Sequence, residues 1–313
     1  MVTSNGMNRR GFLAAAMSAG AAAAAAKGKM EFCVFSKHLQ FLSWAEMAAA
    51  AKEIGFEGVD LTVRKGGHVK PERVADDLPK AAEAIRAAGM RLTMITTDIA
   101  DMTTAHAEPV LRAAKKAGVT HYRWDGYKYK EGVGLPEQLK ALEPRVKELG
   151  AFNKELGMCA MYHTHSGAGR VGASQWDLWL LLKDIDKRYI SYNFDVAHAT
   201  IEGGLGGWVH STRLALPHMG GLALKDFKWG RGGAGKWRVD WCPIGEGMVQ
   251  TREFLRMAKA GGFAGPVQVH YEYDLGGADK GAAKITISKA QAFGAMKRDL
   301  DALRALSVEA GWV

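Results

Sequence analysis

The chain has 313 residues, of which 48% are hydrophobic and 24% are charged, and this composition is that of a folded globular protein. It excludes a disordered chain, a collagen-like fibre and a disulfide-rich scaffold, because the chain has only three cysteines and no C-x-x-C pair. The formal net charge is +9, but residues 1–29 hold four basic and no acidic side chains, which leaves 9 − 4 = +5 for the rest. So small an excess falls short of a nucleic-acid-binding surface, and no nucleic-acid partner is expected.

The N-terminal segment has the features of an export signal. A twin-arginine pair, Arg9 and Arg10, stands before an alanine-rich stretch that runs to Ala26. This arrangement resembles a bacterial Tat signal, so we expect residues 1–29 to be removed and the mature protein to be periplasmic or otherwise exported by the Tat pathway. The alternative is an ordinary alanine-rich helix. No later stretch reaches about 18 apolar residues, so no membrane association is expected once the signal is removed.

From residue 30 onward, short β-rich runs alternate with longer runs rich in alanine and leucine. The expected strands cover residues 31–35, 58–63, 91–96, 120–125, 158–163, 190–195, 221–226 and 266–273. The expected helices cover residues 43–54, 72–88, 105–117, 136–156, 174–186, 206–216, 249–261 and 285–308. Eight such βα units predict an α/β fold, a single (β/α)8 TIM barrel over residues 30–313. A doubly wound sheet is the alternative, but no G-x-G-x-x-G follows the first strand.

Histidines and carboxylates gather at the ends of the last four expected strands. In a TIM barrel the reacting groups lie at these carboxyl-terminal ends, where side chains two apart share a face. The residues concerned are His163, His165, Asp195, His198, Lys225, His270 and Glu272. A mixed set of nitrogen and oxygen donors suits a divalent metal such as Mn, Zn, Co or Fe. The alternative is that His163 and Asp195 only form a hydrogen bond across the barrel.

The order of short motifs along the chain resembles that of the xylose isomerase-like TIM-barrel superfamily. These motifs are Tyr-His-x-His at 162–165, Phe-Asp-x-x-His at 194–198, Leu-Lys-Asp at 224–226, Gly-Glu-Gly at 245–247 and a glutamate, Glu272, near the end of the last strand. The resemblance implies a metal held by side chains from strands five to eight. It assigns Asp195 and Glu272 as ligands, completed by His163 or His165 and by His198. Ala223 stands where the superfamily has a strand-seven histidine.

The resemblance also implies the chemistry. We expect a sugar isomerase or epimerase that removes an α-proton through a metal-stabilised enediolate, acting on a small-molecule sugar or sugar acid. In this scheme Glu272 is a metal ligand or the general base, and Glu246 is a second catalytic carboxylate or only shapes its loop. Lys225 stabilises a developing oxyanion, or forms an ion pair with Asp195 or Asp226.

Further residues are expected to contact the substrate. Arg64 and His68 lie in the glycine-rich loop after strand two, and His198 and His270 lie at strand ends. The segment 227–242 is rich in glycine and tryptophan, and we expect it to form a mobile lid that brings Trp229 and Trp237 over the mouth of the barrel. The alternative is that these tryptophans are buried or form a contact in a homo-oligomer.

Two other functions fit the same residues. A keto-sugar lyase or dehydratase of the same superfamily begins with the same α-proton abstraction. A non-catalytic carbohydrate-binding barrel is the second alternative, and it is favoured by Ala223 and by the missing strand-five glutamate. Binding of a sugar without turnover distinguishes it from an enzyme.

Overall fold

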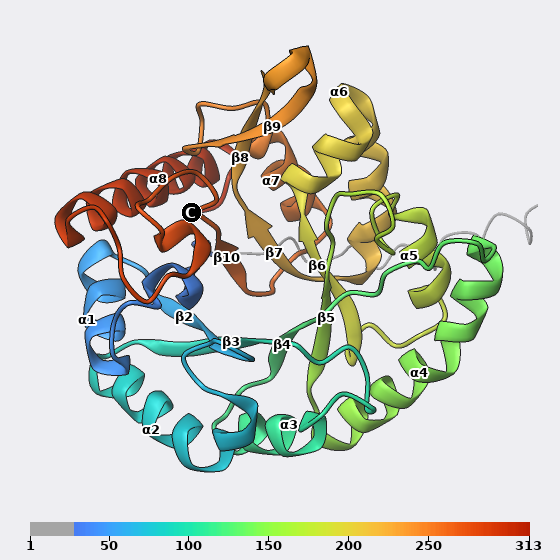
Figure 1. The fold of residues 1–313 in the computed structure, drawn as a ribbon, viewed down its shortest axis with the longest axis horizontal. Coiled ribbons are helices and arrows are strands. Elements are labelled where there is room, and N and C mark those ends of the chain that lie inside the picture. The colour runs from blue at the N-terminus through green and yellow to red at the C-terminus, as the bar shows by residue number, and fades with distance from the viewer. Residues whose placement is uncertain (1–27) are drawn as a thin grey trace, which may run out of the picture.

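The structure, a computed structural model, describes residues 28–313, so the expected export signal lies outside the described residues. It confirms the predicted fold, a closed barrel of parallel strands surrounded by helices (Figure 1). The strands pair in chain order, and the barrel closes where β1 pairs with β10. The barrel strands are β1 (Phe32–Phe35), β2 (Gly58–Val63), β3 (Arg91–Thr97), β4 (His121–Trp124), β5 (Cys159–His163), β6 (Ile190–Asp195), β7 (Met219–Leu224) and β10 (Val267–Val269).

The outer ring consists of α-helices that follow the strands along the chain. Local sequence defines several of their ends: Ser43 and Glu46 form a capping box at the first helix, and Gly55 ends it in the left-handed conformation at φ 109°. The helices are α1 (Trp44–Ile54), α2 (Val74–Ala87), α3 (Ala107–Lys116), α4 (Leu135–Leu156), α5 (Trp176–Leu182), α6 (Val196–Ala215), α7 (Thr251–Ala260) and α8 (Lys289–Glu309). Among the helices described, none is both long enough and apolar enough to span a membrane.

The interior of the barrel has two chemically different ends. Toward the amino-terminal ends of the strands, Cys33, Met94, Cys159 and Met161 form a separate buried cluster of sulfur-containing side chains. Side chains alternate along a strand, so the residues two positions further toward the carboxyl end point into the same interior. On β5 this brings Met161 and then His163 inward, and the interior becomes polar toward the mouth.

Helix α6 begins about ten residues earlier than the sequence predicts. It starts at Val196, directly after β6, and the carboxylate of Asp195 accepts a hydrogen bond from the backbone N–H of His198 as its N-cap. The prediction failed because four of the five residues from 203 to 207 are glycines, which weaken the helical pattern, and Gly204 is indeed non-helical. His198 therefore lies in the first turn of a helix rather than on a strand.

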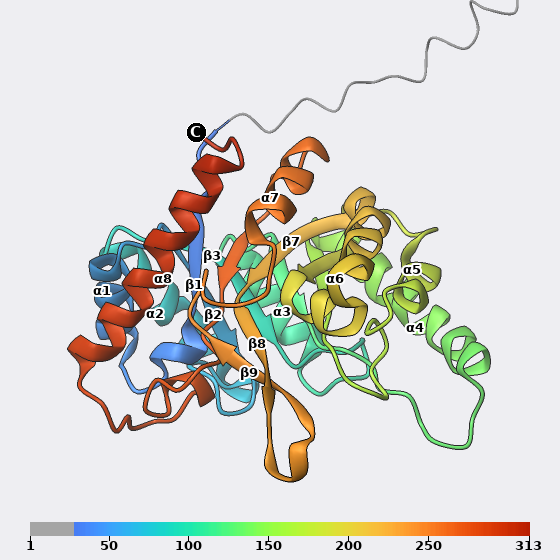
Figure 2. The same cartoon turned by 90° about the horizontal axis from the view of Figure 1, so that it is seen from above.

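The segment 227–242 is also more regular than predicted. It forms an antiparallel hairpin of β8 (Asp226–Arg231) and β9 (Trp237–Cys242) in place of an irregular loop. Figure 2 shows this hairpin projecting beyond the carboxyl-terminal ends of the barrel strands. Cross-strand pairing of alternating side chains explains its order despite the glycines at its tip.

Candidate functional site

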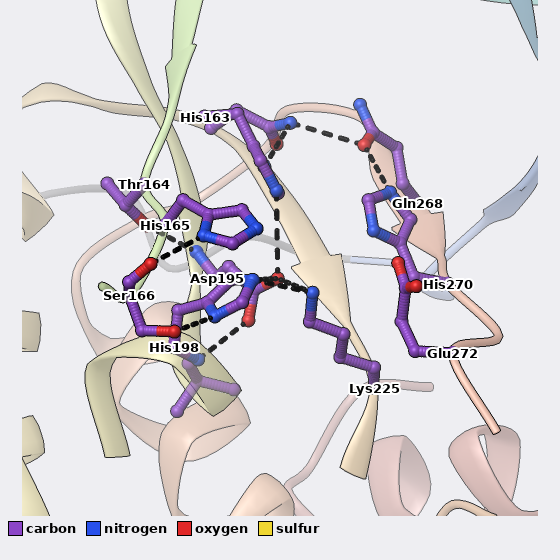
Figure 3. A network of polar contacts seen from close by, with 12 residues as sticks. His163, Thr164, His165, Ser166, Asp195, His198, Lys225, Gln268, His270 and Glu272 are labelled. Atoms are coloured by element: carbon purple, nitrogen blue, oxygen red, sulfur yellow. Dashed lines mark hydrogen bonds and ion pairs between the residues drawn. The ribbon is translucent and has the colours of Figure 1, made fainter. Parts of the chain in front are cut away.

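Three inward-facing side chains meet at the mouth of the barrel. His163 ends β5, Asp195 ends β6 and His270 follows β10, and each is at least 95% buried. One nitrogen or oxygen atom of each lies within 4.8 Å of the corresponding atoms of the other two. Figure 3 shows them pointing toward a common centre. Two imidazoles and a carboxylate are a donor set that divalent transition metals accept.

Asp195 is fully buried and its two oxygens differ in their contacts. Oδ1 accepts the hydrogen bond from the backbone of His198 at 3.0 Å. Oδ2 accepts no hydrogen bond, although the ammonium of Lys225 lies 3.1 Å away and His163 Nε2 lies 3.9 Å away. Burial raises the pKa of Asp195, and the charge of Lys225 opposes that rise. A buried carboxylate oxygen without a hydrogen bond is a position that a cation can fill.

The histidines of the site are held in the neutral form. Burial is the main cause that lowers the pKa values of His163, His198 and His270 well below the usual range, and the nearby charge of Lys225 adds to it. For His165, burial lowers the pKa to about 4. Neutral imidazole is the form that can donate a lone pair to a metal or accept a proton.

Amide side chains below the mouth fix the orientation of two of these rings. The amide nitrogen of Asn193 lies 3.4 Å from His163 Nδ1 and donates to Gln268 Oε1 at 3.2 Å. The same oxygen of Gln268 lies 3.1 Å from His270 Nε2 (Figure 3). The His270 contact is typical of histidines that bind metals, because the ring can donate one N–H to an acceptor oxygen while its other nitrogen keeps a lone pair. The amide nitrogen of Asn193 is a donor, so its contact holds the His163 ring in place without having this character.

Lys225 and His198 form a second layer beside the three converging side chains. Lys225 Nζ donates to His198 Nε2 at 2.7 Å, so the proton of the neutral ring resides on Nδ1, which donates to Ser166 Oγ at 2.8 Å. Both nitrogens of His198 are therefore engaged, and the ring holds Lys225 in place instead of presenting a lone pair to a metal. His165 packs against it with ring centroids 3.8 Å apart.

The two glutamates predicted to be catalytic lie in different surroundings. Glu272 is at the mouth, where its carboxylate pairs with Lys37 at 3.4 Å, and it is not one of the three converging ligands. Glu246 is exposed and lies 3.9 Å from Lys228, away from those ligands. Its loop is shaped by Asp226, whose Oδ2 accepts hydrogen bonds from the backbone of Gly245 and Gly247.

The residues predicted to bind substrate are likewise divided. Arg64 faces the mouth and lies over the ring of Phe35, with its guanidinium carbon 5.4 Å from the ring centroid. His68 turns back toward its own strand, with Nδ1 3.2 Å from Thr62 Oγ1. On the hairpin, the side chains of Trp229 and Trp237 are 39% and 62% exposed.

Two mouth residues, Phe35 and Arg123, were not predicted from the sequence, and a third, Trp241, was expected only as part of the segment 227–242. Phe35 stacks on His270 at 4.8 Å, Arg123 of β4 lies over Phe35 at 5.7 Å, and Trp241 covers the ammonium of Lys225 at 4.6 Å. For Phe35 and Arg123 a signal existed, since each shares the inward parity of its strand near the carboxyl end. Trp241 lies in the segment 227–242 that the sequence predicts to cover the mouth, and its place over Lys225 depends on the pairing of the hairpin.

The molecule is a TIM barrel with two imidazoles and a carboxylate converging at its mouth, a donor set that could hold a divalent metal. The chain belongs to the xylose isomerase-like TIM barrel family, whose model matches residues 48–305. No curated protein matches it by sequence.

Solved structures with the same fold share little sequence with the chain. One is the 3-keto-D-glucoside 4-epimerase from E. coli, with 13% identity over 88% of this chain and 100% of that chain and a TM-score of 0.65. Another is a xylose isomerase-like TIM barrel protein from Mycobacterium smegmatis in complex with magnesium, with 15% identity over 90% and 98% and a TM-score of 0.64. A third is the probable 3-DHS dehydratase AsbF from Bacillus anthracis, with 15% identity over 88% and 98% and a TM-score of 0.64.

Proposed function

We propose that the protein is a metal-dependent sugar isomerase or epimerase that acts by α-proton abstraction. The observation that carries this proposal is the convergence of His163, Asp195 and His270 at the mouth of a barrel of this family. Epimerases among the structural neighbours support the reaction class. Such a site is suited to removing the acidic α-hydrogen of a hydroxy-carbonyl sugar.

The residues present fit a divalent metal. His163 and His270 would supply nitrogen, and Asp195 would supply the buried oxygen that accepts no hydrogen bond. This donor set suits Mn, Zn, Co or Fe, and one structural neighbour holds magnesium. When bound, such an ion polarises a carbonyl oxygen and makes the adjacent C–H bond acidic.

The chain's own residues supply the proton transfers. His165 and Glu272 lie on opposite sides of Lys225 (Figure 3). His165 Nδ1 donates to the carbonyl of Ser166 at 2.7 Å, which leaves Nε2 as a proton acceptor, and Glu272 offers a carboxylate oxygen. Two acceptors that face one substrate can remove a proton and return it, and Lys225 can donate to the oxygen on which negative charge develops.

Metal content is the measurement that tests the proposal. We expect a near-stoichiometric transition metal in the purified wild-type protein and its loss in Asp195→Ala and His270→Ala. Glu246→Ala is the matched control, because that glutamate is exposed and away from the converging ligands. Incorporation of solvent deuterium into keto- and aldo-sugars then tests proton abstraction. Retention of the metal in both ligand variants contradicts the proposed site.

A dehydratase or lyase is the second candidate, and it is favoured by the structural neighbour named as a probable 3-DHS dehydratase. Both reactions begin with the same proton, so the products decide between them. An isomerase or epimerase conserves the mass of the sugar, whereas a dehydratase releases water and yields a product 18 Da lighter, which mass spectrometry separates. Binding without deuterium exchange or turnover indicates instead a carbohydrate-binding barrel.

We also propose that the protein is exported through the Tat pathway, on the basis of Arg9 and Arg10. The full chain expressed in a bacterium with an active Tat system is expected in the periplasmic fraction in a shortened form. Replacement of both arginines by lysine is expected to abolish that fraction. Unchanged localisation of the double variant contradicts the proposal.

A further inference from the structure

Two guanidinium groups face the mouth of the barrel from β2 and β4. Arg64 follows β2 and Arg123 lies within β4, and both guanidinium carbons lie over the ring of Phe35, at 5.4 and 5.7 Å from its centroid. Burial lowers the pKa of Arg123 to about 10, and the positive charge of Arg64 adds to this effect. Two like charges are therefore brought together over one apolar ring at the entrance to the site.

These arginines differ from the other cations of the mouth in having no anionic partner. Lys225 pairs with Asp195 at 3.1 Å and Lys37 pairs with Glu272 at 3.4 Å. Within the described part of the chain, no carboxylate oxygen lies within 4.0 Å of either guanidinium group.

Asp60 is a buried carboxylate whose charge acts on both arginines, and it neutralises them poorly. Asp125 and Glu272 also act on Arg123, without forming an ion pair with it. Both oxygens of Asp60 lie within 2.9 Å of Thr96 Oγ1, and the side chain is fully buried. Burial raises the pKa of Asp60 to about 7, even though both arginines act to lower it. The charge of the arginine pair is therefore left for a molecule that enters the mouth.

The arginine pair lies next to the proposed catalytic residues. Phe35, which both arginines cover, stacks on His270 with ring centroids 4.8 Å apart and an interplanar angle of 28°. Arg123 and His163 line the same small cleft at the mouth. An anionic group held by the arginines thus places the atoms attached to it beside His163 and His270.

We propose that Arg64 and Arg123 bind the carboxylate of the substrate, so that the protein acts on a sugar acid rather than on a neutral sugar. Guanidinium groups bind carboxylates through paired hydrogen bonds, and a bound anion relieves the repulsion between the two arginines. The ring of Phe35, stacked on His270, holds both guanidinium groups beside the proposed metal ligands. This inference rests on the proposed function, because it names the substrate class of that site.

Calorimetric titration with matched pairs of ligands tests the inference. The probes are D-glucuronate against D-glucose, D-galacturonate against D-galactose, and D-gluconate against D-glucitol, with D-glucose 6-phosphate as a fourth anion. We expect at least one acid to bind about tenfold or more tightly than its neutral partner, in line with a charged hydrogen-bonded contact. We expect that preference to be lost in Arg64→Gln and Arg123→Gln and kept in Arg238→Gln, an exposed hairpin control.

Several results would overturn the inference. These are the absence of binding by all three acids, equal affinity within every pair, a preference that survives both arginine variants, or tighter binding of the phosphate ester than of any acid. The wild-type comparison needs no variant, and Arg64→Gln changes a partly exposed side chain, so misfolding does not obscure the outcome.

Deuterium exchange separates this inference from the proposed function. Arginine-dependent binding of an acid without exchange of its α-proton keeps the carboxylate site and rejects the isomerase. Exchange with neutral sugars and no preference for acids keeps the isomerase and rejects the carboxylate site.

Discussion

The two ends of the barrel interior are built on the same strands but contain opposite chemistry. At the base, Cys33, Met94, Cys159 and Met161 pack as a buried cluster. At the mouth, two residues further along β5, His163 joins Asp195, Lys225 and His270. One strand therefore contributes to packing at one end and to a polar site at the other.

Burial of the residues at the base stabilises the fold, whereas burial of the charged residues at the mouth opposes folding. Side chains of the base lose nothing by burial, because they have few polar atoms to desolvate. The mouth buries Asp195 and Lys225, whose desolvation opposes folding and is offset only in part by their mutual attraction. A buried charged pair retained at such a cost indicates a site kept for binding or catalysis rather than for stability.

The largest expected effect is at the mouth, in Asp195→Asn. Removal of the carboxylate charge is expected to abolish metal binding and to lower kcat/KM by about 10³-fold or more. The reason is that polarisation of the substrate by a metal contributes several kcal/mol to the stabilisation of the transition state. Metal analysis and initial rates of the reaction provide the measurement. Cys33→Ala at the base is the control and is expected to keep both metal and rate, because the thiol of Cys33 donates to the backbone carbonyl of Val267. Activity of Asp195→Asn within tenfold of wild type would place the chemistry elsewhere.

Lys225→Met tests the energetic side of the comparison. It leaves Asp195 buried without its cationic partner, which is expected to lower the free energy of unfolding of the metal-free protein by about 3–5 kcal/mol. A metal ion is expected to restore most of that loss, because it supplies positive charge at the same carboxylate. Urea denaturation with and without metal measures both effects, and an equal loss in both conditions would show that the lysine has a purely structural role.

Asp60 lies at the boundary between the two ends, since its register partner on β3 is Met94. Burial raises its pKa to about 7, so between about pH 4 and pH 7 the native protein binds a proton that the unfolded chain has lost. The contribution of Asp60 to stability is therefore present at low pH and is lost as pH rises through this range.

Replacement by asparagine removes that dependence. The free energy of unfolding of Asp60→Asn minus that of wild type is expected to rise by a few kcal/mol between pH 4 and pH 7, on the order of 1.4 kcal/mol for each unit of pKa shift. Urea unfolding at several pH values measures it. A difference that does not change with pH would mean that Asp60 is ionised throughout, as a partner of the arginines.

The base and the barrel were predictable from the sequence because they depend on local periodicity. The alternation of strand and helix predicts the fold, and the parity of strand residues brings His163 and Asp195 to one interior. Glycine-rich stretches were the exception, since they hid the first half of α6 and suggested an irregular loop where β8 and β9 pair.

The sequence did not predict which polar residues at the mouth are metal ligands and which pair with other side chains. His198 and Glu272 have the right residue types for metal ligands, but their partners are Lys225 and Lys37, which come from other parts of the chain. Arg123 has the inward parity of β4 near its carboxyl end, but its position over Phe35 beside Arg64 depends on contacts between strands. Which polar groups pair with each other depends on tertiary contacts that the spacing of motifs does not contain.

The smallest expected effect is at the base, in Met161→Leu. A swap of similar volume in a packed interior is expected to cost less than about 1.5 kcal/mol of stability, with no change in metal content or rate. His163→Leu, two residues along the same strand, is its matched counterpart and is expected to lose the metal, because leucine offers no lone pair. Thermal unfolding and metal analysis of the two variants compare the ends of one strand directly. Loss of metal in Met161→Leu as well would show that packing at the base positions the ligands at the mouth, and that the two ends act as one unit.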